Sequence, residues 1–170
     1  PQIQVTRNGG IYDDQGPVFS EISYSPSSVD VGSGDATVDV TVKLSDPSGV
    51  KHVAVWCSRP DGSMVFGFSI QKIYFAMHQN VSWTLKPAEV ISSNEDWINF
   101  EATVRATIPF ASKPGLFDCT SGSSDSFGNQ SQGYPPQIQV TRTPAGLPGN
   151  PLSLAYSFTG NPRSALQLRW

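Results

Sequence analysis

The 170-residue sequence has few charged side chains, two cysteines and two histidines. Only 15% of the residues are charged, and 11 lysines and arginines are outnumbered by 14 aspartates and glutamates, giving a net charge of −3. Because no basic stripe is available to neutralise phosphates, we expect no nucleic-acid partner. No apolar run approaches the roughly 18 residues that a membrane-spanning helix needs, so we expect no transmembrane segment.

Recognisable catalytic motifs are also missing. His52 and His78 stand outside any metal-ligand spacing or nucleophile motif, and the chain has no Gly-rich phosphate loop or nucleophile elbow. The acidic residues between positions 89 and 101 are explained more simply as surface side chains than as a carboxylate pair for glycoside hydrolysis. We therefore expect that the chain is not an enzyme.

No segment of useful length has helical periodicity. Short alternating segments separated by Gly, Pro, Asp and Ser instead predict an all-β chain. In the clearest segment, 36–44, Val38, Val40, Val42 and Leu44 share one face. Further strands are predicted at 19–24, 50–57, 65–74, 81–85, 97–108, 116–124 and 137–142. This spacing is typical of a β-sandwich.

Residues 1–7 (PQIQVTR) recur unchanged as residues 136–142, an offset of 136 − 1 = 135 residues. This offset is about one sandwich domain, and self-similarity at a fixed period indicates tandem repeats. We therefore interpret residues 1–16 as the end strand of a preceding repeat with its linker, and 17–142 as the sandwich. The chain begins without methionine or a signal peptide, so we expect a mature or excised piece.

Residues 143–170 form a third part. Residues 143–149 have the composition of a linker, and residues 152–158 and 165–170 then alternate like the strands of a hairpin. Two interpretations remain open for this part. It is the start of a further repeat, or it is a C-terminal signal for secretion or barrel assembly, because the alternation runs to an aromatic end at Trp170.

Several turn and strand motifs occur in a fixed order: YSPSSVDV at 24–31, LSDPSGV at 44–50, TIP at 107–109, KPG at 113–115 and DSFGN at 125–129. In this order the chain resembles the bacterial Ig-like and cadherin-like repeats of secreted and cell-surface proteins, over roughly residues 17–142. The resemblance implies an Ig-like Greek-key β-sandwich of seven to eight strands without a catalytic site. Residues 64–97 depart from it, because they are longer and more aromatic than such repeats usually are.

From the repeat and the resemblance we expect a structural or adhesive module of a large extracellular bacterial protein, with neighbouring repeats of the same chain as its partners. Two alternatives remain. The aromatic residues between positions 56 and 97 favour a carbohydrate-binding module of a polysaccharide-degrading enzyme, in which Trp56 stacks on a glycan or cell-surface polymer. The chain is otherwise a subunit of an extracellular filament, in which residues 1–7 are donated into the slot that 136–142 fill.

The two cysteines fall on strands that are antiparallel neighbours in one sheet of an Ig-like sandwich. Alternation places Cys57 and Cys119 on the inward faces of these strands. A disulfide there would close a loop of 119 − 57 = 62 residues and stabilise the fold by up to about 4 kcal/mol. Two buried thiols are the other interpretation, and the sequence leaves both open.

Acidic residues gather in the linker and the predicted turns. If the strand order holds, the turns at Asp46 and at 125–129 lie at one end of the sandwich, next to the linker. Calcium prefers several carboxylate and carbonyl oxygens from flexible loops. A Ca²⁺ ion that stiffens the junction is therefore one hypothesis, with Asp13, Asp14, Asp46, Asp125 and Asn129 as candidate ligands. The simpler interpretation is that each aspartate caps its own turn.

Overall fold

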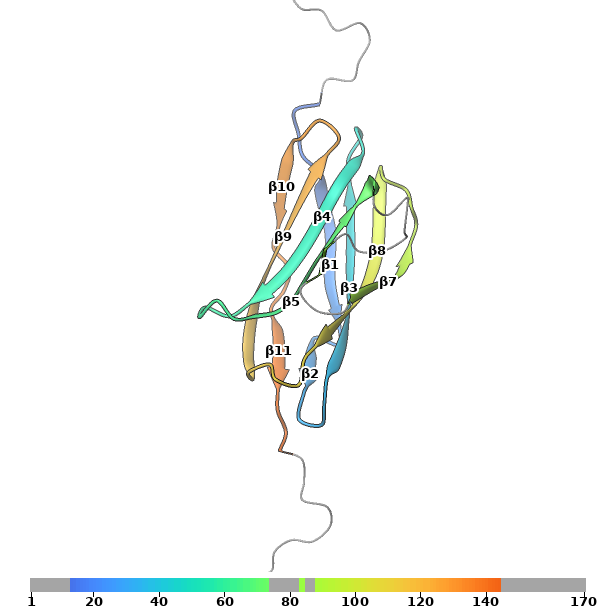
Figure 1. Ribbon diagram of the computed structural model, residues 1–170. Helices are drawn as coiled ribbons and strands as arrows, with labels where there is room; N and C mark the ends of the chain where they lie inside the picture. Colours follow the sequence, from blue (N-terminus) through green and yellow to red (C-terminus); the bar gives the residue numbers. More distant parts are fainter. Residues whose placement is uncertain (1–12, 74–82, 85–87, 145–170) are drawn as a thin grey trace, which may run out of the picture.

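The computed structural model describes residues 13–73, 83–84 and 88–144, which form two β-sheets packed face to face (Figure 1). In the first sheet the strand order is β1-β3-β8-β7, and every neighbouring pair is antiparallel. These strands are β1 (Val18–Ser25), β3 (Ala36–Ser45), β8 (Asn99–Ile108) and β7 (Ala88–Ser93).

The second sheet has the order β2-β11-β9-β4-β5-β6, and β10 also pairs with β9. Its strands are β2 (Ser28–Asp30), β11 (Ile138–Thr141), β9 (Gly115–Asp125), β4 (Val50–Ser58), β5 (Met64–Gln71), β6 (Trp83–Thr84) and β10 (Gln130–Gly133). Only the pairing of β2 with β11 is parallel among the described strands. This is the order of an Ig-like Greek-key sandwich, so the predicted fold class is confirmed.

The core lies between the two sheets and follows the alternation of the sequence. The predicted inward face of β3 is confirmed, because its four members are at most 2% exposed: Val38, Val40, Val42 and Leu44. From the opposite sheet, Val53, Val55 and Phe68 are also fully buried against this core. Burying one apolar face of each sheet is the main force that holds the two layers together.

The described residues contain eleven strands, more than the seven to eight expected, because β7 was not predicted and two further strands are divided at prolines. The chain leaves β1 through the cis Ser25–Pro26 peptide and changes sheets before β2 begins. Pro135 and Pro136 likewise separate β10 from β11. Proline has no N–H to donate to a ladder, so a strand is readily interrupted there.

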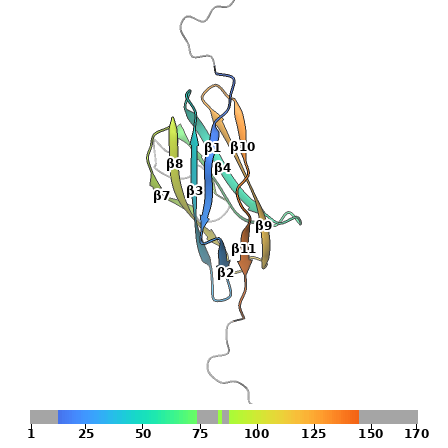
Figure 2. The same cartoon turned by 180° about the vertical axis from the view of Figure 1, so that it is seen from behind.

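The described chain enters and leaves the sandwich at opposite ends (Figures 1 and 2). We call the end made by residues 13–17, 46–49 and 125–129 the upper end, since it lies at the top of Figure 1. The lower end is made by residues 30–35, 109–112 and 142–143. The expectations for residues 1–12 and 145–170, and for His78, lie outside the described residues.

Candidate functional site

Three aspartates meet at the upper end. Asp13 comes from the incoming chain, Asp46 from the turn between β3 and β4, and Asp125 from the end of β9. One carboxylate oxygen from each lies within 4.8 Å of the other two. Asp46 is 1% exposed and Asp125 is fully buried, while Asp13 is partly exposed. The structure thus brings together three of the five residues predicted as calcium ligands.

The turn that follows β3 positions Asp46. Its Oδ1 accepts a hydrogen bond from Ser48 N at 2.8 Å, and Ser48 Oγ lies 2.6 Å from the same oxygen. Gly49 has a φ of 92° and donates its N–H to the Asp46 carbonyl at 3.0 Å. Glycine adopts this left-handed conformation without strain, so the Asp-Pro-Ser-Gly segment closes tightly and holds the carboxylate over the turn.

Asp125 organises the turn between β9 and β10. Its Oδ1 accepts hydrogen bonds from Phe127 N at 2.9 Å and Asn129 N at 2.8 Å. Burial by itself would raise the pKa of Asp125, because it disfavours the charged form. The hydrogen bonds from the Asn129 side chain and from the backbone of the turn outweigh burial, and they hold the pKa below its ordinary value. Asp125 therefore carries its charge inside the protein at neutral pH.

Asn129 joins the incoming chain to this turn. Its Nδ2 donates to Asp125 Oδ2 at 2.6 Å and to the backbone carbonyl of Asp13 at 2.9 Å. The fourth predicted residue thus lies at the site, as a clamp between two of the aspartates. Asp14 does not join the cluster; it is exposed, and its Oδ1 accepts a hydrogen bond from Gln15 Nε2 at 2.9 Å.

Ser48 is a member of the site that the sequence interpretation missed. Its Oγ lies between two carboxylates, 2.6 Å from Asp46 Oδ1 and 3.4 Å from Asp125 Oδ2. The Asp-x-Ser spacing at 46–48 is a signal for such a contact, since serine two residues after aspartate commonly bonds back to the carboxylate. The link to Asp125 depends on the tertiary fold.

The cluster concentrates negative charge in a buried place. Ion pairs among the described residues lie elsewhere and join Lys43, Arg105 and Lys113 to other acids. Neighbouring buried carboxylates repel each other unless a cation or a proton neutralises them. Carboxylate and backbone carbonyl oxygens at this spacing are the ligands that a hard cation such as Ca²⁺ prefers. The arrangement can therefore hold a cation between the incoming chain and two turns.

Trp56 lies on the outer face of β4, as alternation predicts, but it is half-buried rather than freely exposed. In the sheet it stands opposite Gly67 of β5 and Thr120 of β9. Its ring reaches across β9, so a Cβ added to Gly122 would lie 3.8 Å from Trp56 Cη2. The indole therefore lies along the sheet over Gly122, which has no side chain.

A hollow of about 530 Å³ on the same molecule is lined by Lys51, His52, Gln71, Lys72, Ile73 and Ser124, and Trp56 is not among its lining residues. Burial lowers the pKa of His52 below its ordinary value, since it disfavours the charged ring. The aromatic side chain and the hollow thus do not combine into one ligand site.

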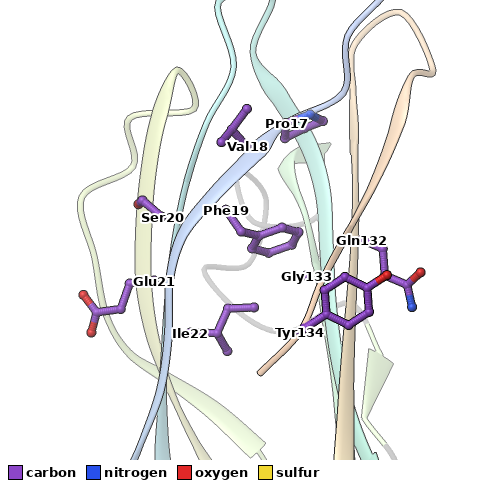
Figure 3. A pocket seen from close by; sticks show the side chains of 9 residues that line it. All are labelled: Pro17, Val18, Phe19, Ser20, Glu21, Ile22, Gln132, Gly133 and Tyr134. Carbon is purple, nitrogen blue, oxygen red and sulfur yellow. The ribbon is translucent and has the colours of Figure 1, made fainter. Parts of the chain in front are cut away.

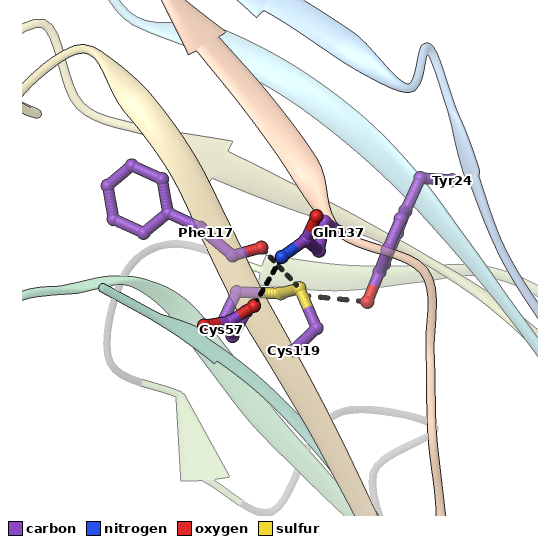
Figure 4. The surroundings of a disulfide bond; sticks show 6 residues. Tyr24, Cys57, Phe117, Cys119 and Gln137 are labelled. Carbon is purple, nitrogen blue, oxygen red and sulfur yellow. Dashed lines mark hydrogen bonds between the residues drawn. A yellow bond between two sulfur atoms is a disulfide. The ribbon is translucent and has the colours of Figure 1, made fainter. Parts of the chain in front are cut away.

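Cys57 and Cys119 are joined by a disulfide in the structure (Figure 4). The two residues stand directly opposite each other on β4 and β9, with their Cα atoms 4.0 Å apart. The disulfide therefore links neighbouring strands of one sheet rather than the two sheets. The Tyr24 hydroxyl lies 3.6 Å from Cys57 Sγ, and burial raises the pKa of Tyr24.

An open groove of about 490 Å³ runs between β1 and β10 (Figure 3). Phe19 and Ile22 of β1 point into it, and a Cβ on Gly133 would collide with the Ser121 hydroxyl behind it. Ser121 Oγ is buried and has no hydrogen-bond partner among the described residues. The groove lies on the side of the sandwich, and none of the three clustered aspartates lines it.

No known family model matches this chain, and no curated protein matches it. Within the described residues, no helix has the length and apolar character that crossing a membrane requires.

Proposed function

We propose that this chain is a non-catalytic structural module of a tandem array in a secreted or cell-surface protein. In this proposal a calcium ion bound by Asp13, Asp46 and Asp125 stiffens the junction with the preceding module. The observation that carries the proposal is the position of the cluster. It places a carboxylate of the incoming chain beside carboxylates from two turns of the sandwich, at the end where a preceding module would connect.

The repeated heptapeptide supports the tandem arrangement. Residues 136–142 contain β11, so the identical residues 1–7 have the sequence of a complete final strand. The resemblance to bacterial Ig-like and cadherin-like repeats points the same way. The Cys57–Cys119 disulfide supports an extracellular location, because such bonds persist in oxidising compartments.

Calcium would act on the junction by fixing the incoming chain. Asp13 belongs to the linker side of the cluster, whereas Asp46 and Asp125 belong to the rigid sandwich. An ion bound by all three restricts how the linker leaves the module. Repetition of such modules gives an elongated protein its reach and spacing, which suits an adhesive or structural role.

We expect calcium to stabilise the full chain, and thermal unfolding with calorimetric titration checks this. Extracellular calcium modules bind with Kd values of about 10⁻⁴ to 10⁻³ M. At about ten times Kd the ion stabilises the fold by about 1.4 kcal/mol, because it binds only the native state. For a chain of this size the melting temperature then rises by about 3–6 °C.

Two neighbouring aspartates provide a matched pair of variants. Asp13→Asn removes one charge from the cluster, and we expect it to weaken calcium binding about tenfold or more, a loss of about 1.4 kcal/mol. Asp14→Asn removes the same charge one residue away, outside the cluster, and should bind as the wild type does. Absence of heat and of a melting shift at millimolar calcium would contradict the proposal, and equal losses in both variants would contradict the location.

A further inference from the structure

The chain leaves the lower end along a fixed path. Thr143 N donates to Asp30 Oδ1 at 3.0 Å, and a Cβ on Gly32 would collide with the Thr143 carbonyl oxygen. The Arg142 guanidinium donates to the carbonyl of Phe110 and, at 3.1 Å, to that of Ser112. These contacts fasten the last residues of the module to the turn after β8 and to the loop after β2.

The incoming chain is fastened to the upper end in the same way. Asn129 holds the Asp13 carbonyl, and the Ser131 hydroxyl donates to the carbonyl of Pro17. A Cβ on Gly16 would lie only 2.6 Å from the backbone carbonyl of Gln130, so no side chain fits there. Residues 13–17 therefore have a defined position on the sandwich.

The identity of residues 1–7 with 136–142 then sets the length of the free linker. Residue 8 follows Arg7 as Thr143 follows Arg142, so in sequence it corresponds to Thr143 of a preceding copy. The five steps from residue 8 to Asp13 span at most about 18 Å when fully extended. A linker this short brings the lower end of one copy close to the upper end of the next.

Each end presents a large aromatic side chain on a protruding turn. Phe110 at the lower end is 45% exposed, and the Arg142 guanidinium lies 4.5 Å from the centre of its ring. Phe127 at the upper end is 50% exposed and belongs to the turn that Asp125 holds. Asp30 and Asp35 lie beside Arg142 at the lower end, so a contact between the two ends would be apolar rather than charged. Each end therefore offers an exposed phenylalanine on a turn to the other.

We propose that the Phe110 turn of one copy docks on the Phe127 turn of the next copy in a head-to-tail contact. The partner of the upper end is then a second copy of this chain, held in place by the short linker. This inference rests on the tandem arrangement of the proposed function and is independent of calcium. A head-to-tail contact of this kind does not close on itself, so it repeats along an array.

The repeated heptapeptide allows a direct test. Joining residues 1–142 to residues 8–170 gives a two-unit chain in which Arg142 precedes Asn8, just as Arg7 does in the natural sequence. We expect ¹⁵N relaxation to give both units one common rotational correlation time, longer than that of the single chain. Phe110→Ala in the first unit, at the junction, should release the units to tumble separately.

The same substitution in the second unit is the matched control, because there Phe110 lies at a free end. We expect it to leave the common correlation time unchanged, and any effect on folding is the same at both positions. Phe127→Ala should behave in reverse, uncoupling the units only when it is placed in the second unit. Independent tumbling of the unsubstituted units, or equal effects at both positions, would overturn the docking contact.

Measurement with calcium and with a chelator separates this inference from the calcium proposal. If the common correlation time of the two units requires Phe110 of the first unit but is the same with calcium and with chelator, the docking contact is supported and the calcium junction is contradicted. If the common correlation time appears only with calcium and is unchanged by Phe110→Ala and Phe127→Ala, the calcium junction is supported and the docking contact is overturned.

Discussion

At the scale of single residues, the upper end depends on how one buried carboxylate is satisfied. Asp125 accepts hydrogen bonds from two backbone N–H groups of its own turn and from the Asn129 side chain. The same Asn129 side chain also donates to the Asp13 carbonyl and so holds the incoming chain. A buried charge is tolerated only when such partners replace water. The turn and the linker are thus fixed by one hydrogen-bonded unit.

Acid should weaken this unit. The pKa of Asp125 is lowered in the folded protein, so its ionised form stabilises the fold above the unfolded pKa of about 4. That stabilisation is lost as the pH falls through the folded pKa. In metal-free solution we therefore expect Asp125→Asn to lose less stability than the wild type between about pH 4 and pH 2, measured by chemical unfolding. Parallel losses in the two proteins would contradict this role.

Residue-scale prediction from the sequence was partly successful. Turn chemistry placed Asp46 and Asp125 in turns, and the strand order then placed the two turns at one end. The choice between Asp13 and Asp14 could not be made from local sequence, since the two side chains are identical. In the structure Asp13 is the one that joins the cluster. Its backbone carbonyl accepts a hydrogen bond from Asn129, which lies 116 residues away along the chain.

At the scale of elements, β11 completes the second sheet. Ile138 and Val140 are fully buried, and the strand pairs with β9 on one side and β2 on the other. The Gln137 side chain also donates to Asp118 at 2.5 Å (Figure 4). In the filament alternative, residues 1–7 of another subunit would fill the position of β11. In this structure the chain's own residues 138–141 fill that position.

The two copies of the heptapeptide offer a matched test of this assignment. Ile138→Ala should cost about 2–5 kcal/mol, because it leaves a cavity in the core. Ile3→Ala changes the same residue in the same local sequence, and we expect it to shift the melting temperature by less than about 2 °C. Thermal unfolding of both variants compares them. A comparable loss from Ile3→Ala would contradict the view that residues 1–7 lie outside this core.

The long alternating strands were predictable, whereas three short strands were not. β10 has the sequence QSQG, without an apolar side chain, and a hydroxyl pair between Ser123 and Ser131 at 2.7 Å ties it to β9. β2 has only three residues, and it pairs with β11 from the far end of the sequence. β7 is a half-exposed edge strand with a register shift between Val90 and Ser92. Their stability comes from non-local partners, which local patterns do not reveal.

At the scale of the whole molecule, the described chain enters and leaves the sandwich at opposite ends, which suits the proposed elongated array (Figure 2). A disulfide within one sheet links two strands of the module itself, while the aspartate cluster lies at the end where the proposed preceding module would connect. A rod built from such units depends on its junctions, because each sandwich is already held by its own core. The central claim is therefore the control of this junction by calcium.

Small-angle X-ray scattering of the two-unit chain tests that claim most directly when Phe110→Ala in the first unit removes the proposed docking contact. In about 1 mM calcium we expect the narrow pair-distance distribution of an extended, rigid pair of units. Addition of a chelator should broaden it, because the linker is then freed from Asp46 and Asp125. Asp13→Asn in the second unit should give the broad distribution under both conditions. If the profile of this chain, with Asp13 intact, is identical with calcium and with chelator, the account is contradicted.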